Sequence, residues 1–177
     1  DFVSCMLADC EGDRINVKRR IYLPHSMGSF YTMICDFIGY RKYGDEGKIM
    51  GLAPYGTDTF KDIFEQIVHL DEKGFELNTK FFMPFGSTQG MGINEDGEVE
   101  LSRHYSNHTI DMFGAPNEPY STVEQRDYDL AYGAQRMFNK VYFHMLNILH
   151  DMVPCDRISM AGGSVLNSVA NGMIFDK

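Results

Sequence analysis

The sequence predicts a mixed α/β domain, and three observations lead to this prediction. Two β-rich runs, 2–8 and 15–22, stand on either side of turn-forming residues. Apolar residues then recur at helical spacing in three longer segments. Near the end of the chain, a short β-rich run at 157–161 leads through Gly162-Gly163 into a further helical run from about Val165 to Ile174. We therefore expect one end of a mixed sheet, followed by helices and a last strand.

Composition and charge exclude several classes of protein. The chain has 177 residues, of which 44% are hydrophobic and 23% charged, as in folded globular proteins rather than disordered chains. A formal net charge of −9 argues against binding to the nucleic-acid backbone. No stretch approaches the roughly 20 apolar residues of a membrane span. The chain starts at Asp1 without a methionine and ends abruptly at Lys177, so we expect an internal fragment of a longer protein.

The cysteine pattern indicates reduced thiols. The four cysteines form no CxxC pair, have no metal-finger spacing and are too few for a disulfide framework. They are Cys5, Cys10, Cys35 and Cys155. We expect buried, reduced thiols in a cytoplasmic protein.

The first half of the chain predicts a hairpin followed by two helices. The two β-rich runs pair across residues 9–13. Ser26 is the expected N-cap of a buried helix that ends at Gly39, whereas the glycine-rich stretch 40–56 is not expected to form a long regular element. Asp58 is the expected cap of a second helix. The apolar face of that helix is predicted to consist of Phe60, Ile63, Phe64, Ile67 and Leu70.

The second half predicts short strands and then one long helix. Between 71 and 120 we expect strands and turns, including a hairpin of 91–94 with 99–102, and a polar, irregular stretch at 103–120. Ser121 and Glu124 fit a capping box. The helix that they open keeps an apolar stripe for about 28 residues.

The junction at 157–174 is the sharpest local signal for a binding site. A helix N-terminus presents unpaired N–H groups, and glycines there let a phosphate or ribose approach the backbone. Asn167 and Asn171 are four residues apart and share one helix face near that end. The alternative is a tight turn in which the glycines only allow close packing.

Three other segments hold candidate residues. Ser26 and Gly28 open a helix, where the same anion argument applies beside the alternative of a plain N-cap. Lys48 is a candidate partner of a phosphate and Glu46 of a sugar hydroxyl, against a solvated loop as the alternative. The His104-x-x-x-His108 spacing suits a helical metal site, but it has no carboxylate third ligand at useful spacing, and we expect no metal there.

Three blocks of the sequence together resemble one family. They read PHSMGSFYTMICDFIGYRKYGDEGKIMGLAPYG at 24–56, DLAYGAQRMF at 129–138 and ISMAGGSVLNSVANGMI at 158–174. Their content, order and separation are similar to those of the NodU/CmcH-type O-carbamoyltransferases of nodulation-factor and antibiotic biosynthesis. Asp1 resembles the last residue of the family's DGxGD strand turn. The resemblance covers nearly the whole chain and is weakest from 57 to 115.

The resemblance implies an actin-like ATPase fold (ASKHA, ribonuclease H-like), with residues 1–177 as an internal fragment of that domain. In the family, a YrdC-like C-terminal domain outside this chain makes carbamoyladenylate from carbamoyl phosphate and ATP. The actin-like domain then transfers the carbamoyl group to a hydroxyl of a small-molecule acceptor, assisted by a divalent metal ion, iron or magnesium. Neither nucleic acid nor a membrane is an implied partner.

The resemblance also implies where the donor lies. Three residues would contact the nucleotide of the carbamoyladenylate: Gly162, Gly163 and Asn167. Three would line the same cleft from the other side: Ser26, Gly28 and Lys48. The family's HxxxH and a further metal aspartate fall outside this chain, and FGAPN at 113–117 stands where members usually read FGPPR. We therefore expect no metal ligand within the chain and no activity from this piece alone.

Two other functions stay open on the sequence. An actin-like sugar kinase would transfer phosphate to a similar acceptor, with ADP as its product, and needs a catalytic aspartate that the sequence does not place. A non-catalytic nucleotide-binding or assembly module would keep the Gly162-Gly163 junction, in a parent chain without the flanking metal residues.

Overall fold

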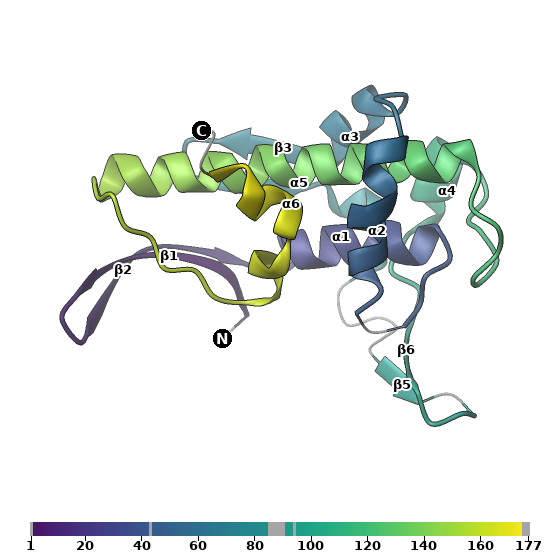
Figure 1. Cartoon of the computed structure of the whole chain (residues 1–177), viewed down its shortest axis with the longest axis horizontal. Helices are drawn as coiled ribbons and strands as arrows, with labels where there is room; N and C mark the ends of the chain where they lie inside the picture. The colour runs from purple at the N-terminus through teal and green to yellow at the C-terminus, as the bar shows by residue number, and fades with distance from the viewer. Residues whose placement is uncertain (1, 43, 85–90, 94, 175–177) are drawn as a thin grey trace.

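The computed structural model describes residues 2–42, 44–84, 91–93 and 95–174, and a single long helix organises them (Figure 1). This helix, α5 (Gln125–Met152), runs the length of the molecule. Its buried face follows helical spacing and includes Leu130, Ala134, Met137, Val141 and Met145. Neither α5 nor any other helix in the described ranges combines the length and apolar character needed to cross a membrane.

The predicted first hairpin and first helix are confirmed. Strands β1 (Val3–Glu11) and β2 (Arg14–Tyr22) pair antiparallel around a turn at Gly12, whose φ is +61°. Helix α1 (Met27–Phe37) is capped by Ser26, whose hydroxyl accepts a 3.2 Å hydrogen bond from the Ser29 N–H.

The predicted mixed sheet is not formed within the described residues. Instead, three separate two-stranded antiparallel sheets are present: β1–β2, β3 (Val68–Asp71) with β4 (Gly74–Leu77), and β5 (Met91–Ile93) with β6 (Val99–Leu101). The last of these confirms the predicted second hairpin. Among the residues that the structure describes, no strand pairs with 157–161, and Ile158 is 47% exposed, so the predicted strand there is wrong. A strand needs a neighbouring backbone as well as a β-rich sequence.

Short helices occupy the segment between α1 and β3. Helix α2 (Glu46–Leu52) and the 3₁₀ turn η1 (Ala53–Tyr55) form within the glycine-rich stretch. Helix α3 (Lys61–Ile67) begins after Phe60 without a side-chain cap, so the predicted cap at Asp58 is wrong. The Asp58 carboxylate lies instead 2.9 Å from Nε of Arg136 on α5. Leu70, expected on the helix, belongs to β3.

Two further corrections concern helix starts in the second half. Helix α4 (Asn107–Phe113) forms in the stretch expected to be irregular, because Ser106 caps it and Thr109 and Phe113, four residues apart, are buried. The capping box of α5 is made by Glu124 and Asp127 rather than by Ser121 and Glu124. The 3₁₀ turns η2 (Thr79–Phe81) and η3 (Gly163–Leu166) and helix α6 (Ser168–Gly172) complete the fold.

The core joins α1, α3, α4 and α5 through aromatic side chains. The Phe64 ring lies 6.1 Å from that of Phe30 and 5.4 Å from that of Phe113, measured between centroids. Gly133 on α5 makes this packing possible, because a Cβ at that position would lie 2.1 Å from Cε2 of Phe64. At Gly133 the backbone of α5 therefore packs directly against the Phe64 ring.

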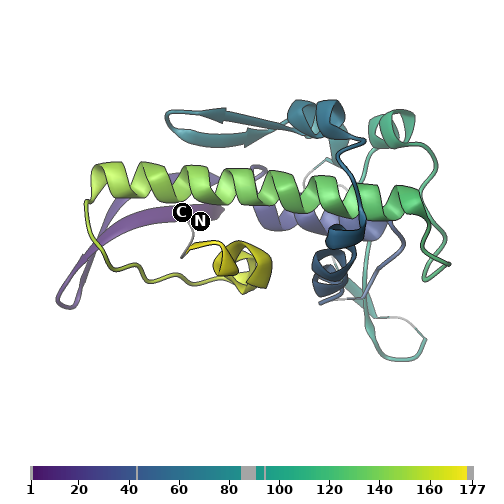
Figure 2. The same cartoon turned by 45° about the horizontal axis from the view of Figure 1, so that its top comes forward.

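The remaining elements lie on different sides of α5. Figure 2 shows β3–β4 on one side of the helix and α6 on the other.

All four cysteines are free thiols. Cys35 is buried, and burial raises the pKa of its thiol, but Cys10 and Cys155 are exposed, so the prediction of buried thiols is wrong for these two.

Candidate functional site

Two of the predicted segments, far apart in the sequence, lie against each other. These are the N-terminus of α1 and residues 162–166, which we call the glycine turn (Figure 1). A Cβ at Gly28 would lie 3.5 Å from Oγ of Ser26 and 3.8 Å from Oγ of Ser164. The structure therefore brings Ser26 and Gly28 together with Gly162 and Gly163.

The glycine turn presents an open backbone. Gly162 has a φ of +105°, which favours glycine, and its carbonyl accepts a 3.1 Å hydrogen bond from the Val165 N–H. A Cβ at either Gly162 or Gly163 would meet nothing within 4 Å. Both residues are exposed. A ligand can therefore approach this backbone without displacing a side chain.

The helix predicted after the glycine turn is interrupted. Residues 163–166 form the 3₁₀ turn η3, and α6 follows with only five residues. The predicted helical run from about Val165 to Ile174 is therefore wrong. Because α6 is so short, its N-terminus no longer supports the argument for a bound anion at this end. What remains is the accessible backbone of the turn.

Asn167 has its side chain turned into the protein. It is 6% exposed, and its Oδ1 accepts a 2.9 Å hydrogen bond from the Ala170 N–H. Its amide also pairs with the amide of Gln135 on α5, with both hydrogen bonds at 3.1 Å. Asn171 donates to the Val165 carbonyl at 2.7 Å and accepts from the Tyr142 hydroxyl at 2.7 Å. The two asparagines thus fasten this segment to α5.

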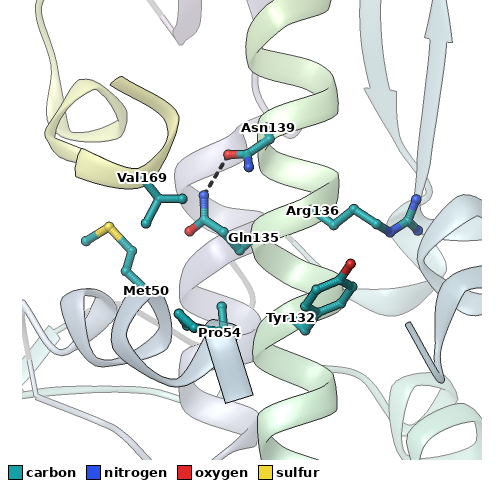
Figure 3. Close-up of a pocket in the computed structure, with 8 residues that line it drawn as sticks. Met50, Pro54, Tyr132, Gln135, Arg136, Asn139 and Val169 are labelled. Atoms are coloured by element: carbon teal, nitrogen blue, oxygen red, sulfur yellow. Dashed lines mark hydrogen bonds between the residues drawn. The ribbon is translucent and has the colours of Figure 1, made fainter. Parts of the chain in front are cut away.

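A cavity of about 250 Å³ lies beside this segment, between α2, η1, α5 and α6 (Figure 3). Its lining residues are Met50, Ala53, Pro54, Tyr132, Gln135, Arg136, Asn139 and Val169. In Figure 3 the Gln135 and Asn139 side chains point from α5 toward Val169, whereas Arg136 points away from them. One wall is therefore polar, and Met50, Pro54 and Val169 supply apolar surface.

Lys48 on α2 contacts Asp45 and two tyrosine rings. Its Nζ lies 2.7 Å from Oδ1 of Asp45, and it stands over the rings of Tyr40 and Tyr120, at 4.8 Å and 5.1 Å from their centroids. The hydrogen bond to Asp45 raises the pKa of the Lys48 ammonium. From α2 it is Met50, not Lys48, that reaches the segment after the glycine turn, with its sulfur 3.9 Å from Oγ of Ser168.

The predicted site residues therefore fall into two groups. Ser26 and Gly28 lie beside the glycine turn, where Gly162 and Gly163 have open backbone, and Asn167 continues the same segment. The contacts of Lys48, with Asp45, Tyr40 and Tyr120, lie outside that group. Glu46 is tied to α1, because its Oε1 accepts a 2.9 Å hydrogen bond from the Thr32 hydroxyl.

The two histidines of the 104–108 spacing have separate surroundings. The His104 Nδ1 lies 4.0 Å from Oδ2 of Asp36, and the His108 ring packs against Phe81 at 4.7 Å between centroids. Within the described ranges, no three His, Cys, Asp or Glu side chains are grouped so that they could hold a metal ion.

Sequence reasoning missed the polar residues behind the site. Gln135 is 5% exposed and bonds to Tyr31, Asn139 and Asn167. Burial raises the pKa of the Tyr31 phenol. A signal was present in the sequence, because Gln135 stands beside Ala134 on the apolar face of α5. A polar side chain on a buried helix face predicts a hydrogen-bonded partner in the core.

Comparison with known proteins identifies the family of the chain. Residues 4–177 match the family described as the carbamoyltransferase N-terminus. The chain belongs to this family.

Several curated proteins are similar over most of the chain. It is 30% identical over 167 residues to the uncharacterized protein sll1178 of Synechocystis, covering 93% of this chain and 25% of that protein. It is 28% identical over 176 residues to the nodulation protein NolNO of Sinorhizobium fredii, covering 98% and 22%. Nodulation protein NolO of Bradyrhizobium diazoefficiens is 26% identical over 176 residues, covering 98% and 28%. The chain spans about a quarter of the length of these relatives.

Proposed function

We propose that this chain is part of the actin-like N-terminal domain of an O-carbamoyltransferase, and that it binds the nucleotide of a carbamoyladenylate donor. The observation that carries the proposal is the contact between the N-terminus of α1 and the glycine turn, in a chain of the carbamoyltransferase N-terminal family. The nucleotide would lie beside the contact of Gly28 with Ser164, against the open backbone of Gly162 and Gly163. The acceptor would be a small molecule with a free hydroxyl.

Backbone groups support the proposed nucleotide contact. Helix α1 has 11 residues, and the Ser26 hydroxyl satisfies the N–H of Ser29, the third residue of the helix. The N-terminal N–H groups of such a helix favour an anion. The exposed Gly162 and Gly163 add backbone that a phosphate or ribose can approach closely.

The neighbouring cavity supports a second contact with the same ligand. At about 250 Å³ it is smaller than the ~300–1,000 Å³ pockets that hold drug-sized ligands, and its walls are mostly apolar. It suits one flat, partly polar portion of a ligand, such as a nucleobase. The proposed ligand therefore reaches from the glycine turn toward Met50 and Val169.

The chemistry proposed for the parent protein is acyl transfer from a mixed anhydride. The acceptor hydroxyl oxygen forms a bond to the carbamoyl carbon, the bond from that carbon to the phosphate oxygen breaks, and AMP leaves. The hydroxyl proton passes to a base or to solvent. AMP is a good leaving group, so orienting the acceptor and stabilising charge on the carbamoyl oxygen are the main tasks of the protein.

Other components of the reaction are expected elsewhere in the parent. Carbamoyl phosphate and ATP would be converted to carbamoyladenylate by a YrdC-like domain of the same chain. The residues described in this chain do not form a site for the divalent ion, iron or magnesium, that the resemblance implies, and we assign the ion no step. Because the precursor ATP is cytoplasmic, we propose that the reaction takes place in the cytoplasm.

Nucleotide products of the full-length parent test this proposal. The parent is incubated with ATP and Mg²⁺, with and without carbamoyl phosphate, and pyrophosphate and ADP are measured. We expect pyrophosphate only when carbamoyl phosphate is present. ADP formed without carbamoyl phosphate would contradict the proposal and favour a kinase. The absence of turnover would also contradict it and favour a binding module.

A further inference from the structure

Gln135 uses all of its hydrogen-bonding capacity inside the protein. Its Oε1 accepts from the Tyr31 hydroxyl at 2.7 Å and from Nδ2 of Asn167 at 3.1 Å. Its Nε2 donates to Oδ1 of Asn139 at 2.7 Å and to Oδ1 of Asn167 at 3.1 Å. A primary amide has two donors and two acceptor sites, so none is left for a ligand. Although Gln135 lines the cavity, it has no free group with which to bind an occupant.

The orientation of both amides is fixed by one backbone group. The Ala170 N–H can only donate, so the Asn167 atom 2.9 Å away from it must be the oxygen. The NH₂ group of Asn167 then faces Gln135, which sets the orientation of the second amide. The Tyr31 hydroxyl, which donates to the same Gln135 oxygen, is consistent with this assignment.

The amide pair connects three helices to the glycine turn. Tyr31 lies on α1, Gln135 on α5, and Asn167 is the N-cap of α6. The Asn167 N–H also donates to the Ser164 carbonyl at 3.3 Å, inside the glycine turn. Ser164 is the residue of the turn that Gly28 faces. The pair therefore holds the turn at its position relative to α1.

We propose that Gln135 is a positioning residue for the glycine turn, and that Asn167 acts through this amide pair rather than by touching the nucleotide with its side chain. The part of this inference that concerns nucleotide affinity rests on the proposed function. The part that concerns the turn itself does not, and it is measurable in the chain without any ligand.

The substitution Gln135→Glu tests the pair by exchanging one NH₂ group for an oxygen. Asn167 cannot rotate its amide in response, because the Ala170 N–H holds its oxygen. An ionised carboxylate at 135 therefore faces the Asn167 oxygen without a proton between them. When protonated, the carboxyl can donate that hydrogen bond again, and burial raises its pKa. The defect should therefore weaken as the pH falls.

The experiment compares the wild-type chain with Gln135→Glu and with the control Gln66→Glu. Gln66 is exposed on α3, so the control carries the same change of charge away from the pair. Hydrogen exchange at pH 7.5, without ligand, reports the opening of the amides of 163–170. Calorimetric titration with AMP at pH 7.5 and pH 5.5 reports affinity.

In Gln135→Glu we expect exchange at 163–170 to be about tenfold faster and AMP affinity about tenfold weaker at pH 7.5, since a buried acceptor loses its donor. Part of the affinity should return at pH 5.5, and Gln66→Glu should behave as the wild type at both pH values. A purely structural loss would not recover with pH. If Gln135→Glu does not fold, Tyr31→Phe removes one donor to the same oxygen, and a smaller increase in exchange at 163–170 is expected.

Equal exchange at 163–170 in Gln135→Glu and Gln66→Glu would overturn the inference. A second outcome is that exchange is faster in Gln135→Glu but the wild-type chain does not bind AMP. This outcome would support the positioning role of Gln135 and count against the proposed function. The two failures are therefore distinguishable.

Discussion

The backbone N–H of His104 donates a 2.8 Å hydrogen bond to Oδ2 of Asp36, across 68 residues of sequence. Asp36 lies on α1 and has no exposed surface. Nε of Arg41 donates to its Oδ1 at 3.2 Å. Burial raises the pKa of Asp36, and these hydrogen bonds reduce the shift without reversing it. A buried carboxyl thus attaches the segment before α4 to the end of α1.

Asp36→Asn should change how stability depends on pH. Because the pKa of Asp36 is raised in the folded state, the unfolded chain releases this proton first, and stability falls as pH rises from about 4. The asparagine cannot ionise. We expect the free energy of unfolding of Asp36→Asn to increase relative to that of the wild type between pH 4 and pH 7, which means that the variant gains in relative stability. Urea titrations at several pH values measure this, with the exposed Asp111→Asn as a control. A difference that is constant with pH would contradict the expectation.

Asp129→Asn should have the opposite dependence. Burial opposes ionisation of Asp129, but hydrogen bonds from Gln125, Thr57 and Thr59 lower its pKa overall. A lowered pKa stabilises the folded state above the unfolded value, and this stabilisation is lost as pH falls through the folded value. We expect a loss of about 1–2 kcal/mol at pH 7 and a smaller loss at pH 3, measured by urea unfolding.

The control for this prediction is Asp62→Asn on the exposed side of α3. It should change stability by less than about 0.5 kcal/mol at either pH. Equal losses in the two variants would show that the contacts of Asp129 with 57–59 do not stabilise the fold.

Gly133→Ala should destabilise the core. The added methyl would lie 2.1 Å from Cε2 of the buried Phe64, so α5 or the ring must move. Overpacking of this kind costs about 1–3 kcal/mol. Gly51→Ala on α2 is the matched control, because its methyl would meet nothing within 4 Å, and it should be neutral or stabilising by about 0.4–1 kcal/mol. Thermal unfolding of both variants measures the difference in stability. Equal midpoint temperatures of unfolding would contradict the packing argument.

Lys48→Met tests whether the predicted phosphate partner takes part in binding. The Lys48 side chain is 46% exposed, and loss of its ion pair with Asp45 should change stability by less than about 1 kcal/mol. If the lysine turns from Asp45 to a phosphate when nucleotide binds, ATP affinity should fall about tenfold. Calorimetry with ATP measures it, and Lys61→Met on α3 is the control. Unchanged affinity in Lys48→Met would place this lysine outside the site.

Elements with strong local patterns could be predicted from the sequence. The β1–β2 hairpin has two β-rich runs around a turn, α1 has Ser26 before an apolar stripe, and α5 keeps its stripe over 28 residues. Helix α4 was missed because only Thr109 and Phe113 of its residues are buried, which leaves a polar sequence. The start of α5 was misplaced because Glu124 and Asp127 form a capping box at the same spacing as Ser121 and Glu124.

Features that depend on distant parts of the chain could not be predicted in the same way. The segment 157–161 reads as a strand, but a strand exists only beside another backbone. For the site, the sequence indicated both the glycine turn and the start of α1, and only the structure shows that Gly28 faces Ser164. The sequence could not show that the Asn167 side chain points inward, because this depends on its hydrogen bond to Gln135, 32 residues earlier.

Nucleotide binding by the chain with a valine in the glycine turn tests the central claim most directly. Gly163 has room for a side chain and needs no positive φ, so Gly163→Val should fold while filling the space that the nucleotide would occupy. Gly172→Val, also with nothing within 4 Å, is the control. We predict that AMP and ATP bind to the wild type and to Gly172→Val, and at least tenfold more weakly to Gly163→Val. Equal affinity in the three proteins would contradict a nucleotide site at this turn.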